Sequence, residues 1–207
     1  MKKKYIASFA VLFAGVISFS VMLSAETPLE TKSSQIPKQV ESNLQLETKT
    51  IFQLDKISIT NQDVENFKAY QQIGDSSLTD KEIIEQLATE QIYLSVAQQK
   101  NVAATLEEGK QEALKNREIL KTQPQNIQNT QLKLIKLMGL DEEEYWNDFA
   151  PKEYQKILTA QNLTKLLLEE NILKYNSNQP QEFGKELKAY KHNLYVQALK
   201  KANVLPE

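Results

Sequence analysis

The stretch that decides the fold is residues 78–102, which read LTDKEIIEQLATEQIYLSVAQQKNV. Thr79 and Glu82 are three residues apart, which predicts a helix start where the Thr79 side chain accepts a hydrogen bond from a free backbone N–H and Glu82 lies near the positive end of the helix dipole. Apolar residues then recur at helical spacing: Ile83, Leu87, Leu94 and Ala97, flanked by Ile84, Ala88 and Ile92. A stripe this broad has to be buried against other elements, so the stretch predicts a helical domain with a shared core.

The same capping spacing recurs elsewhere in the chain. Three further pairs predict helix starts: Thr60 with Asp63, Thr105 with Glu108, and Asp141 with Glu144. Apolar residues at helical spacing continue in two later stretches, residues 145–167 and residues 183–198. Pro151 interrupts the first, so we expect a kink or a break into two helices near Ala150.

Composition favours helix over sheet, since the 207 residues include only 5 Gly and 6 Pro and are rich in Lys, Glu, Gln and Leu. The one strand signal is Ile51–Ile59, where apolar and polar residues alternate. Residues 26–50 contain Pro28 and Pro37 and have no sustained apolar period, which is typical of a flexible tether.

The first 25 residues have the pattern of an export signal. Lys2, Lys3 and Lys4 precede the uncharged run Tyr5–Ala25, and the chain turns polar at Glu26. The apolar run 6–23 is long for a cleaved segment and near the lower limit for a bilayer of about 30 Å, so a signal peptide cut after residue 25 and a retained membrane anchor are both open. Either way, we expect an extracytoplasmic protein, secreted or anchored at the outer face of the cytoplasmic membrane.

Charge and cysteine content exclude several classes. Residues 1–25 hold three of the 25 basic residues and none of the 27 acidic ones, so the remainder has a net charge of −5. A mildly acidic chain with mixed signs has no electrostatic footprint for nucleic acid. The absence of cysteine excludes a lipid-modified anchor and requires a fold held by packing alone.

Several segments carry a family resemblance through their order: a strand-like Leu54–Ile59, TNQDV at 60–64, LTDKEIIEQL at 78–87, EQIYLSVAQQKNV at 90–102, TLEE at 105–108 and MGLDEEEYW at 138–146. Together they resemble the chaperone domain of the SurA/PrsA group of extracytoplasmic folding factors, related in shape to the substrate-binding part of trigger factor. The likeness runs from Leu54 to the C-terminus. It implies a mainly α, SurA N-terminal-like domain over residues 51–207 with a short strand pair, after a signal or anchor segment.

The resemblance also implies a helix, Tyr190–Ala202, that returns to complete the domain, with Val204 and Leu205 beside the strand Ile57–Ile59. A parvulin-type isomerase module needs on the order of a hundred residues before that helix. The chain offers only Asn176–Pro180 there. We therefore expect the chaperone half without prolyl isomerase activity.

Other chemistry finds little support in the sequence. The only histidine, His192, has no nucleophile motif or Gly-rich elbow with it and is expected on the surface of a helix. The acidic run Asp141–Glu144 lacks calcium-loop spacing, so we interpret it as the first turn of a helix rather than a metal site. No phosphate-binding Gly motif occurs. We predict no enzymatic activity, cofactor or metal, although a hydrolase with a cryptic site stays open.

Large aromatic side chains are the candidate client contacts: Phe67, Tyr70, Tyr93, Trp146 and Tyr154. In a regular helix Trp146 points about 100° away from Tyr145, so it is either exposed for recognition or packed against the returning helix. These considerations favour an ATP-independent holdase for unfolded or partly folded exported proteins. The alternative is an envelope interaction or structural protein that docks one specific partner. Apolar patches that are several and separated favour the first, and one compact patch favours the second.

Overall fold

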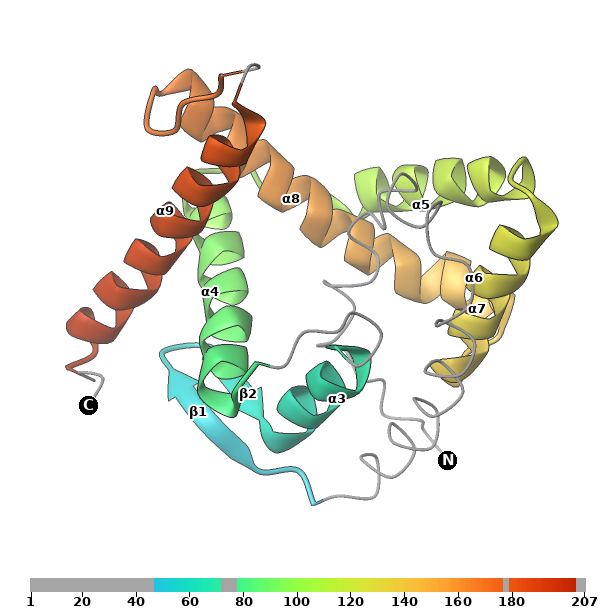
Figure 1. Ribbon diagram of the computed structural model, residues 1–207, viewed down its shortest axis with the longest axis horizontal. Helices are drawn as coiled ribbons and strands as arrows, with labels where there is room; N and C mark the ends of the chain where they lie inside the picture. The colour runs from blue at the N-terminus through green and yellow to red at the C-terminus, as the bar shows by residue number, and fades with distance from the viewer. Residues whose placement is uncertain (1–46, 72–77, 177–178, 204–207) are drawn as a thin grey trace. The chain divides into compact units, whose positions relative to one another are not determined.

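The computed structural model describes residues 47–71, 78–176 and 179–203, in which two strands and a series of helices form. In chain order the elements are β1 (Thr50–Leu54), β2 (Ile57–Thr60), α3 (Asn61–Gln71), α4 (Asp80–Gln99), α5 (Leu106–Lys121), α6 (Gln125–Leu137), α7 (Glu142–Glu144), a π-helical turn (Tyr145–Phe149), α8 (Ala150–Glu169) and α9 (Pro180–Lys201) (Figure 1). The predicted mainly α fold with a short strand pair is confirmed.

The predicted signal or anchor segment, residues 1–25, lies outside the described residues, as does the predicted tether up to residue 46. Among the helices that are described, none combines the length and the apolar character needed to cross a bilayer.

The described residues form two compact units. We call residues 48–64, 78–103 and the described part of 159–203 the hairpin unit, and residues 65–71 with 104–158 the tryptophan unit. Within the described residues the chain passes between the units inside α3, after Val64, between α4 and α5, after Ala103, and inside α8, after Leu158. The expected single helical domain over residues 51–207 stays a prediction.

The hairpin unit begins with an antiparallel strand pair in which Phe52 lies opposite Ile59. Asp55 occupies the turn with φ 52°, a left-handed conformation that Asp adopts more readily than most residues. Leu54 and Ile59 are buried. Periodicity predicted a single strand over Ile51–Ile59 because this turn carries neither the Asn-Gly nor the Asp-Gly that marks many hairpins.

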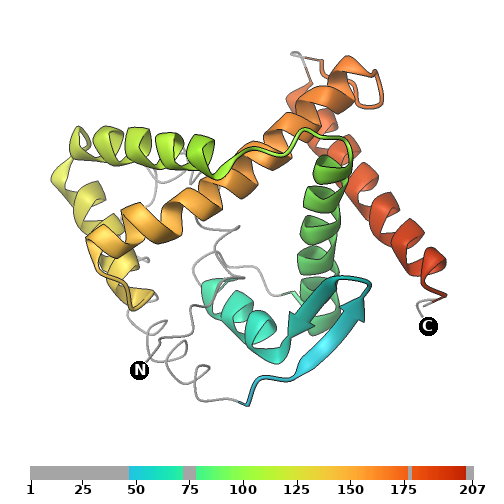
Figure 2. The ribbon, with the colours of Figure 1, turned by 180° about the vertical axis from the view of Figure 1, so that it is seen from behind.

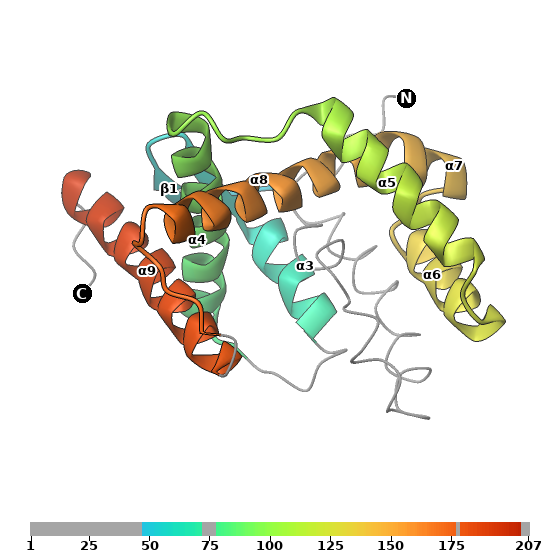
Figure 3. The ribbon, with the colours of Figure 1, turned by 90° about the horizontal axis from the view of Figure 1, so that it is seen from above.

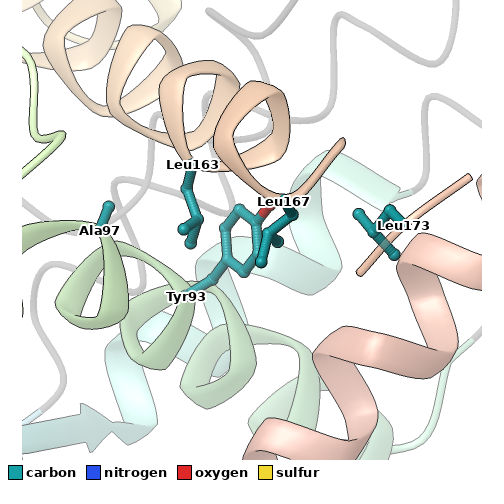
Figure 4. Packing of buried hydrophobic residues seen from close by; sticks show 5 residues of the cluster. All are labelled: Tyr93, Ala97, Leu163, Leu167 and Leu173. Carbon is teal, nitrogen blue, oxygen red and sulfur yellow. The ribbon is translucent and has the colours of Figure 1, made fainter. Parts of the chain in front are cut away.

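The core of the hairpin unit is centred on Tyr93 of α4. Its ring is fully buried and lies beside Leu163 and Leu167 of α8, with Ala97 and Leu173 in the same cluster (Figure 4). Burial of the ring raises the pKa of the Tyr93 hydroxyl. Of the apolar stripe that the sequence predicts on this helix, Ala97 belongs to this cluster, whereas Tyr93 lies outside the predicted stripe.

Helix α9 packs along α4 in the same unit (Figures 1 and 2). Leu199, near the end of α9, packs with Leu54 of β1 and Ile92 of α4. The returning helix predicted from the family resemblance thus lies beside the strand pair. The predicted contact of Val204 and Leu205 with the strands lies outside the described residues.

All four predicted capping pairs form. Reciprocal hydrogen bonds join Thr60 with Asp63, Thr79 with Glu82, and Thr105 with Glu108, while Asp141 accepts from the N–H of Glu144 at 2.7 Å. At Thr79 the backbone N–H donates to Glu82 Oε2 at 2.8 Å. These bonds with Thr79 lower the pKa of Glu82. Each pair satisfies backbone donors that the first helical turn leaves free.

Helix ends show a second, unpredicted pattern. The residue after the last helical turn has positive φ at Asn101, Gly139, Asn171 and Asn203. At the end of α4 the N–H of Val102 donates to Ala97 O at 3.0 Å, and both side chains belong to the Tyr93 cluster. This is the arrangement in which a left-handed residue turns the chain and an apolar residue after it packs back on the helix.

The core of the tryptophan unit gathers side chains from α5, α6, the π-helical turn and α8. Its buried members are Ala113, Ile135, Tyr145, Trp146 and Ala150. Figure 3 shows the ribbons of α5, α6 and α8. The predicted disturbance at Pro151 is found, but the helix does not break. The wide turn Tyr145–Phe149 precedes α8, and the N–H of Ala150 donates to Tyr145 O, five residues back.

Gly109 sets the distance between α5 and α8 within this unit. A Cβ at this position would lie 2.2 Å from Pro151 O and 2.8 Å from Gln155 N, both backbone atoms. Gln155 also donates from Nε2 to Ala104 O at 3.0 Å, just before α5 begins. The two backbones therefore approach as closely as only glycine permits.

We expect Gly109→Ala to destabilise the protein by about 1–3 kcal/mol, because the added methyl group forces two helix backbones apart. Gly184→Ala is the matched control, since a Cβ at Gly184 in α9 meets no atom within 4 Å. That change should stabilise by about 0.5–1 kcal/mol, the ordinary gain of alanine over glycine in a helix. Urea denaturation followed by circular dichroism measures both. Equal effects of the two substitutions would contradict the close approach.

Two substitutions of Tyr93 can separate the contribution of its ring packing to stability from that of its hydroxyl hydrogen bond. The Tyr93 hydroxyl lies 2.8 Å from Thr164 Oγ1, and the Thr164 hydroxyl can donate to Ala160 O, also at 2.8 Å, which leaves Tyr93 as the donor. We expect Tyr93→Phe to cost about 1 kcal/mol and Tyr93→Ala about 3–5 kcal/mol in the free energy of unfolding. Denaturant titration measures both values. Similar losses for the two variants would mean that the ring contributes little to the core.

Candidate functional site

The predicted client contacts are mostly core residues. Phe67, Tyr93 and Trp146 are 1%, 0% and 4% exposed, and Tyr154 is half-buried. The side chain of Tyr70 lies outside what the structure describes. Tyr93 belongs to the hairpin unit, whereas Trp146 and Tyr154 belong to the tryptophan unit. In this conformation the three buried rings fill cores, where large aromatic side chains bury the most apolar area. Their role in client binding stays a prediction.

Trp146 is neither exposed nor packed as the sequence suggested. It lies in a cluster with Ala113, Ile135 and Ala150, and its ring meets the Tyr145 ring edge-on at a centroid distance of 4.9 Å. In a regular helix Tyr145 and Trp146 point in different directions, which is why the sequence leaves exposure of Trp146 open. Helices α5 and α6 both contribute to the cluster, so both directions are covered.

Two tyrosine hydroxyls beside this cluster are shielded from solvent. Burial raises the pKa of Tyr145 to about 12, although Gln131 Nε2 donates to its hydroxyl at 3.3 Å. Burial likewise raises the pKa of Tyr154. Both phenols therefore keep their protons at neutral pH, which suits packing rather than proton transfer.

Three buried polar atoms of the tryptophan unit have no hydrogen-bond partner among the described residues. They are Arg117 Nε, Trp146 Nε1 and Glu153 Oε2. Glu153 is only 2% exposed, and its other oxygen accepts from Lys156 Nζ at 2.8 Å. Burial raises the pKa of Glu153, and the positive charge of Lys156 partly opposes that effect. An unpaired buried acceptor is costly, which makes this carboxyl unusual in the structure.

In the acidic run Asp141–Glu144, carboxylates cap a helix and form ion pairs. Asp141 caps the helix, and Glu143 binds the Arg117 guanidinium and accepts from Asn147 Nδ2 at 3.0 Å. The hydrogen bond with Arg117 lowers the pKa of Glu143, with a further contribution from Asn147. Within the described residues, no group of three His, Asp or Glu side chains is arranged to hold a metal ion.

His192 lies on the surface of α9, as predicted. Its side chain is 55% exposed, and Nδ1 lies 2.6 Å from Glu85 Oε1 on α4. One residue earlier, Lys191 Nζ donates to Glu90 at 2.8 Å and lies 4.6 Å from the centre of the Tyr93 ring. These contacts join α9 to α4 at the edge of the Tyr93 cluster.

The exposed apolar side chains are different residues from those predicted. On α5 they are Leu106, Leu114 and Ile119, which are 50%, 38% and 40% exposed. In the hairpin unit they are Ile51 on β1 and Ile172 and Tyr175 between α8 and α9, with 46%, 45% and 60% exposed. The large aromatic residues that the sequence predicts as client contacts mostly lie in the cores. Apart from Tyr175, the exposed residues are aliphatic and lie outside the predicted helical stripes.

One of these exposed residues, Tyr175, contacts a second aromatic ring. Tyr175 meets the ring of Phe183 edge-on at a centroid distance of 5.6 Å, and Phe183 packs against the Tyr93 cluster. Tyr175 is thus held at the protein surface by a core neighbour rather than left as a free side chain. A held ring presents apolar area at a small entropic cost when a partner binds.

Comparison of the chain with protein-family models, with curated proteins and with solved structures found no match. The resemblance to the SurA/PrsA group therefore stays a prediction.

Proposed function

We propose that the protein is an extracytoplasmic, ATP-independent holdase that binds unfolded segments of exported proteins and has no prolyl isomerase activity. The observation that carries the proposal is the exposure of large apolar side chains on three separate elements: α5, β1 and the connection between α8 and α9. The extracytoplasmic location rests on the export-type pattern of residues 1–25.

Such side chains bind client segments by removing apolar area from water, at about 25 cal/mol per Å² before ordering costs. A leucine that is half exposed, such as Leu106, then contributes about 1 kcal/mol when a client covers it. Several contacts of this size give weak binding that tolerates many sequences. Neither a nucleotide nor a metal takes part in this mechanism.

The surroundings of the α5 residues suit transient contact. Lys110 lies between Leu106 and Leu114 along the helix, and Glu112 pairs with the exposed Lys115 at 3.3 Å. Charged residues between the apolar ones keep a surface soluble while leaving the aliphatic groups accessible. The same helix is capped at Thr105, which fixes the position of Leu106 in its first turn.

The competing function is docking of one specific partner in the cell envelope. A dedicated docking site gathers its apolar residues into a compact patch with a polar rim. On α5 the residues Leu114 and Ile119 are five positions apart, which places them about 140° apart around a regular helix. This dispersal supports general, low-specificity contact over a single docking patch.

The first experiment is suppression of aggregation. The protein is purified after export, with or without residues 1–25 as the cell leaves it. It is added without ATP to a chemically unfolded model protein, and aggregation is followed by light scattering over time. We expect suppression at near-stoichiometric ratios. No suppression over a wide concentration range would reject the holdase and favour a dedicated partner, to be sought by crosslinking in cells.

The double variant Leu106→Gln with Leu114→Gln tests whether the exposed leucines of α5 bind the unfolded client. We expect it to need about tenfold more protein for the same suppression, because two apolar contacts are lost. Lys110→Gln is the control, since it changes the same side of α5 without removing apolar area. Equal loss in the two proteins would exclude apolar burial on α5 as the mechanism.

A further inference from the structure

Glu153 is an ionisable group in the interior of the tryptophan unit that the proposed function does not use. Its side chain is 3% exposed, and Oε2 has no hydrogen-bond partner among the described residues. A carboxylate in such a place loses its hydration and gains only part of the compensation that a paired ion receives. A protonated carboxyl avoids most of that cost.

The free-energy cost of a buried charge at Glu153 acts on an irregular part of the helix. Glu153 lies in the first turn of α8, two residues after Pro151, which cannot donate a backbone hydrogen bond. The π-helical turn immediately before α8 supplies Tyr145 and Trp146 to the core. The least regular part of this helical segment therefore lies next to the unpaired carboxyl. The indole N–H of Trp146 in that turn is also buried, with no hydrogen-bond partner in the described part of the chain.

The charges that act on Glu153 come from a few described residues. Lys156 contacts it directly at 2.8 Å, and the positive charge of Lys152 also attracts it. The Tyr145 hydroxyl is also within electrostatic range, but its pKa of about 12 keeps it neutral. The Gln131 amide that donates to this hydroxyl carries no charge. Burial moves the ionisation of the Glu153 carboxyl to higher pH.

We propose that the protonation of Glu153 controls how tightly the tryptophan unit packs around Trp146. With the proton bound, the first turn of α8 and the π-helical turn stay closed over the core. When the proton is released, the buried charge draws in water and loosens this segment, and Trp146 becomes accessible to solvent. This inference does not depend on the holdase proposal.

The sign of the effect follows from linkage. Burial raises the pKa of Glu153 in the folded protein above its ordinary value of 4.5. Its contribution to stability is therefore complete below that ordinary value and is lost as pH rises through the folded pKa. Between the ordinary value and the folded pKa, each pH unit favours the loosened state by up to about tenfold, and above the folded pKa the effect levels off.

Trp146 is the only tryptophan in the chain, so its fluorescence reports on this unit alone. The test is quenching of that fluorescence by acrylamide in the full chain, between pH 4.5 and pH 8.5. We expect quenching of the wild-type protein to rise with pH. Glu153→Gln should quench weakly and equally across the range, because the amide cannot ionise. A wild-type profile without a rise, or a Glu153→Gln profile parallel to the wild type, would overturn the proposal.

Glu118→Gln is the matched control. Glu118 pairs with Lys121 three residues on, as Glu153 pairs with Lys156, but both members of that pair are exposed. It should follow the wild-type profile, and a flat profile for it would also count against Glu153. If Glu153→Gln does not fold, Lys156→Gln takes its place. Loss of the lysine charge should move the quenching transition to higher pH, and an unmoved transition would overturn the proposal.

Discussion

The arrangement of the tryptophan unit depends on how the chain accommodates Pro151. A proline inside a helix removes one backbone donor and crowds the carbonyl four residues earlier. Here the π-helical turn Tyr145–Phe149 takes up the misfit, and α8 then continues as one helix to Glu169. The carbonyl of Pro151 in turn faces Gly109, the one residue type that lets α5 approach so closely. A proline, a widened turn and a glycine therefore fix the packing of this unit together.

The two units solve the problem of burying aromatic rings differently. In the hairpin unit Tyr93 packs on leucines and meets the Tyr190 ring edge-on, its hydroxyl reaches Thr164, and charged pairs such as Lys191 with Glu90 lie around it. In the tryptophan unit the aromatic rings also pack on each other, but three buried polar atoms have no hydrogen-bond partner among the described residues. A fully satisfied core favours a single conformation, whereas unsatisfied groups lower the cost of local opening. The tryptophan unit is thus the part of the described structure where we expect motion.

Local signals in the sequence predicted the helix starts well, because capping depends on residues within three positions of each other. Thr79 with Glu82 and Thr105 with Glu108 form the bonds expected from spacing alone. The helix ends were equally local but were not predicted. Asn or Gly followed by an aliphatic residue, as in Asn101-Val102 and Gly139-Leu140, marks them in the printed sequence. The same pattern, Asn or Gly before an aliphatic residue, therefore predicts where a helix ends.

The location of Trp146 was not predictable in the same way, since it depends on contacts between segments far apart in the sequence. In a regular helix Trp146 and Tyr145 point in different directions, yet residues of α5 and α6 pack in one cluster with both rings. Residue type misled the choice of client contacts for a related reason. A chain without disulfides that divides into small units must place its largest apolar side chains in its cores. Apart from Tyr175, the apolar area left for a partner is then aliphatic and lies outside the regular helical stripes, at residues such as Leu106, Leu114 and Ile172. A search for binding surfaces in such chains should therefore begin with the apolar residues that the helical pattern does not use.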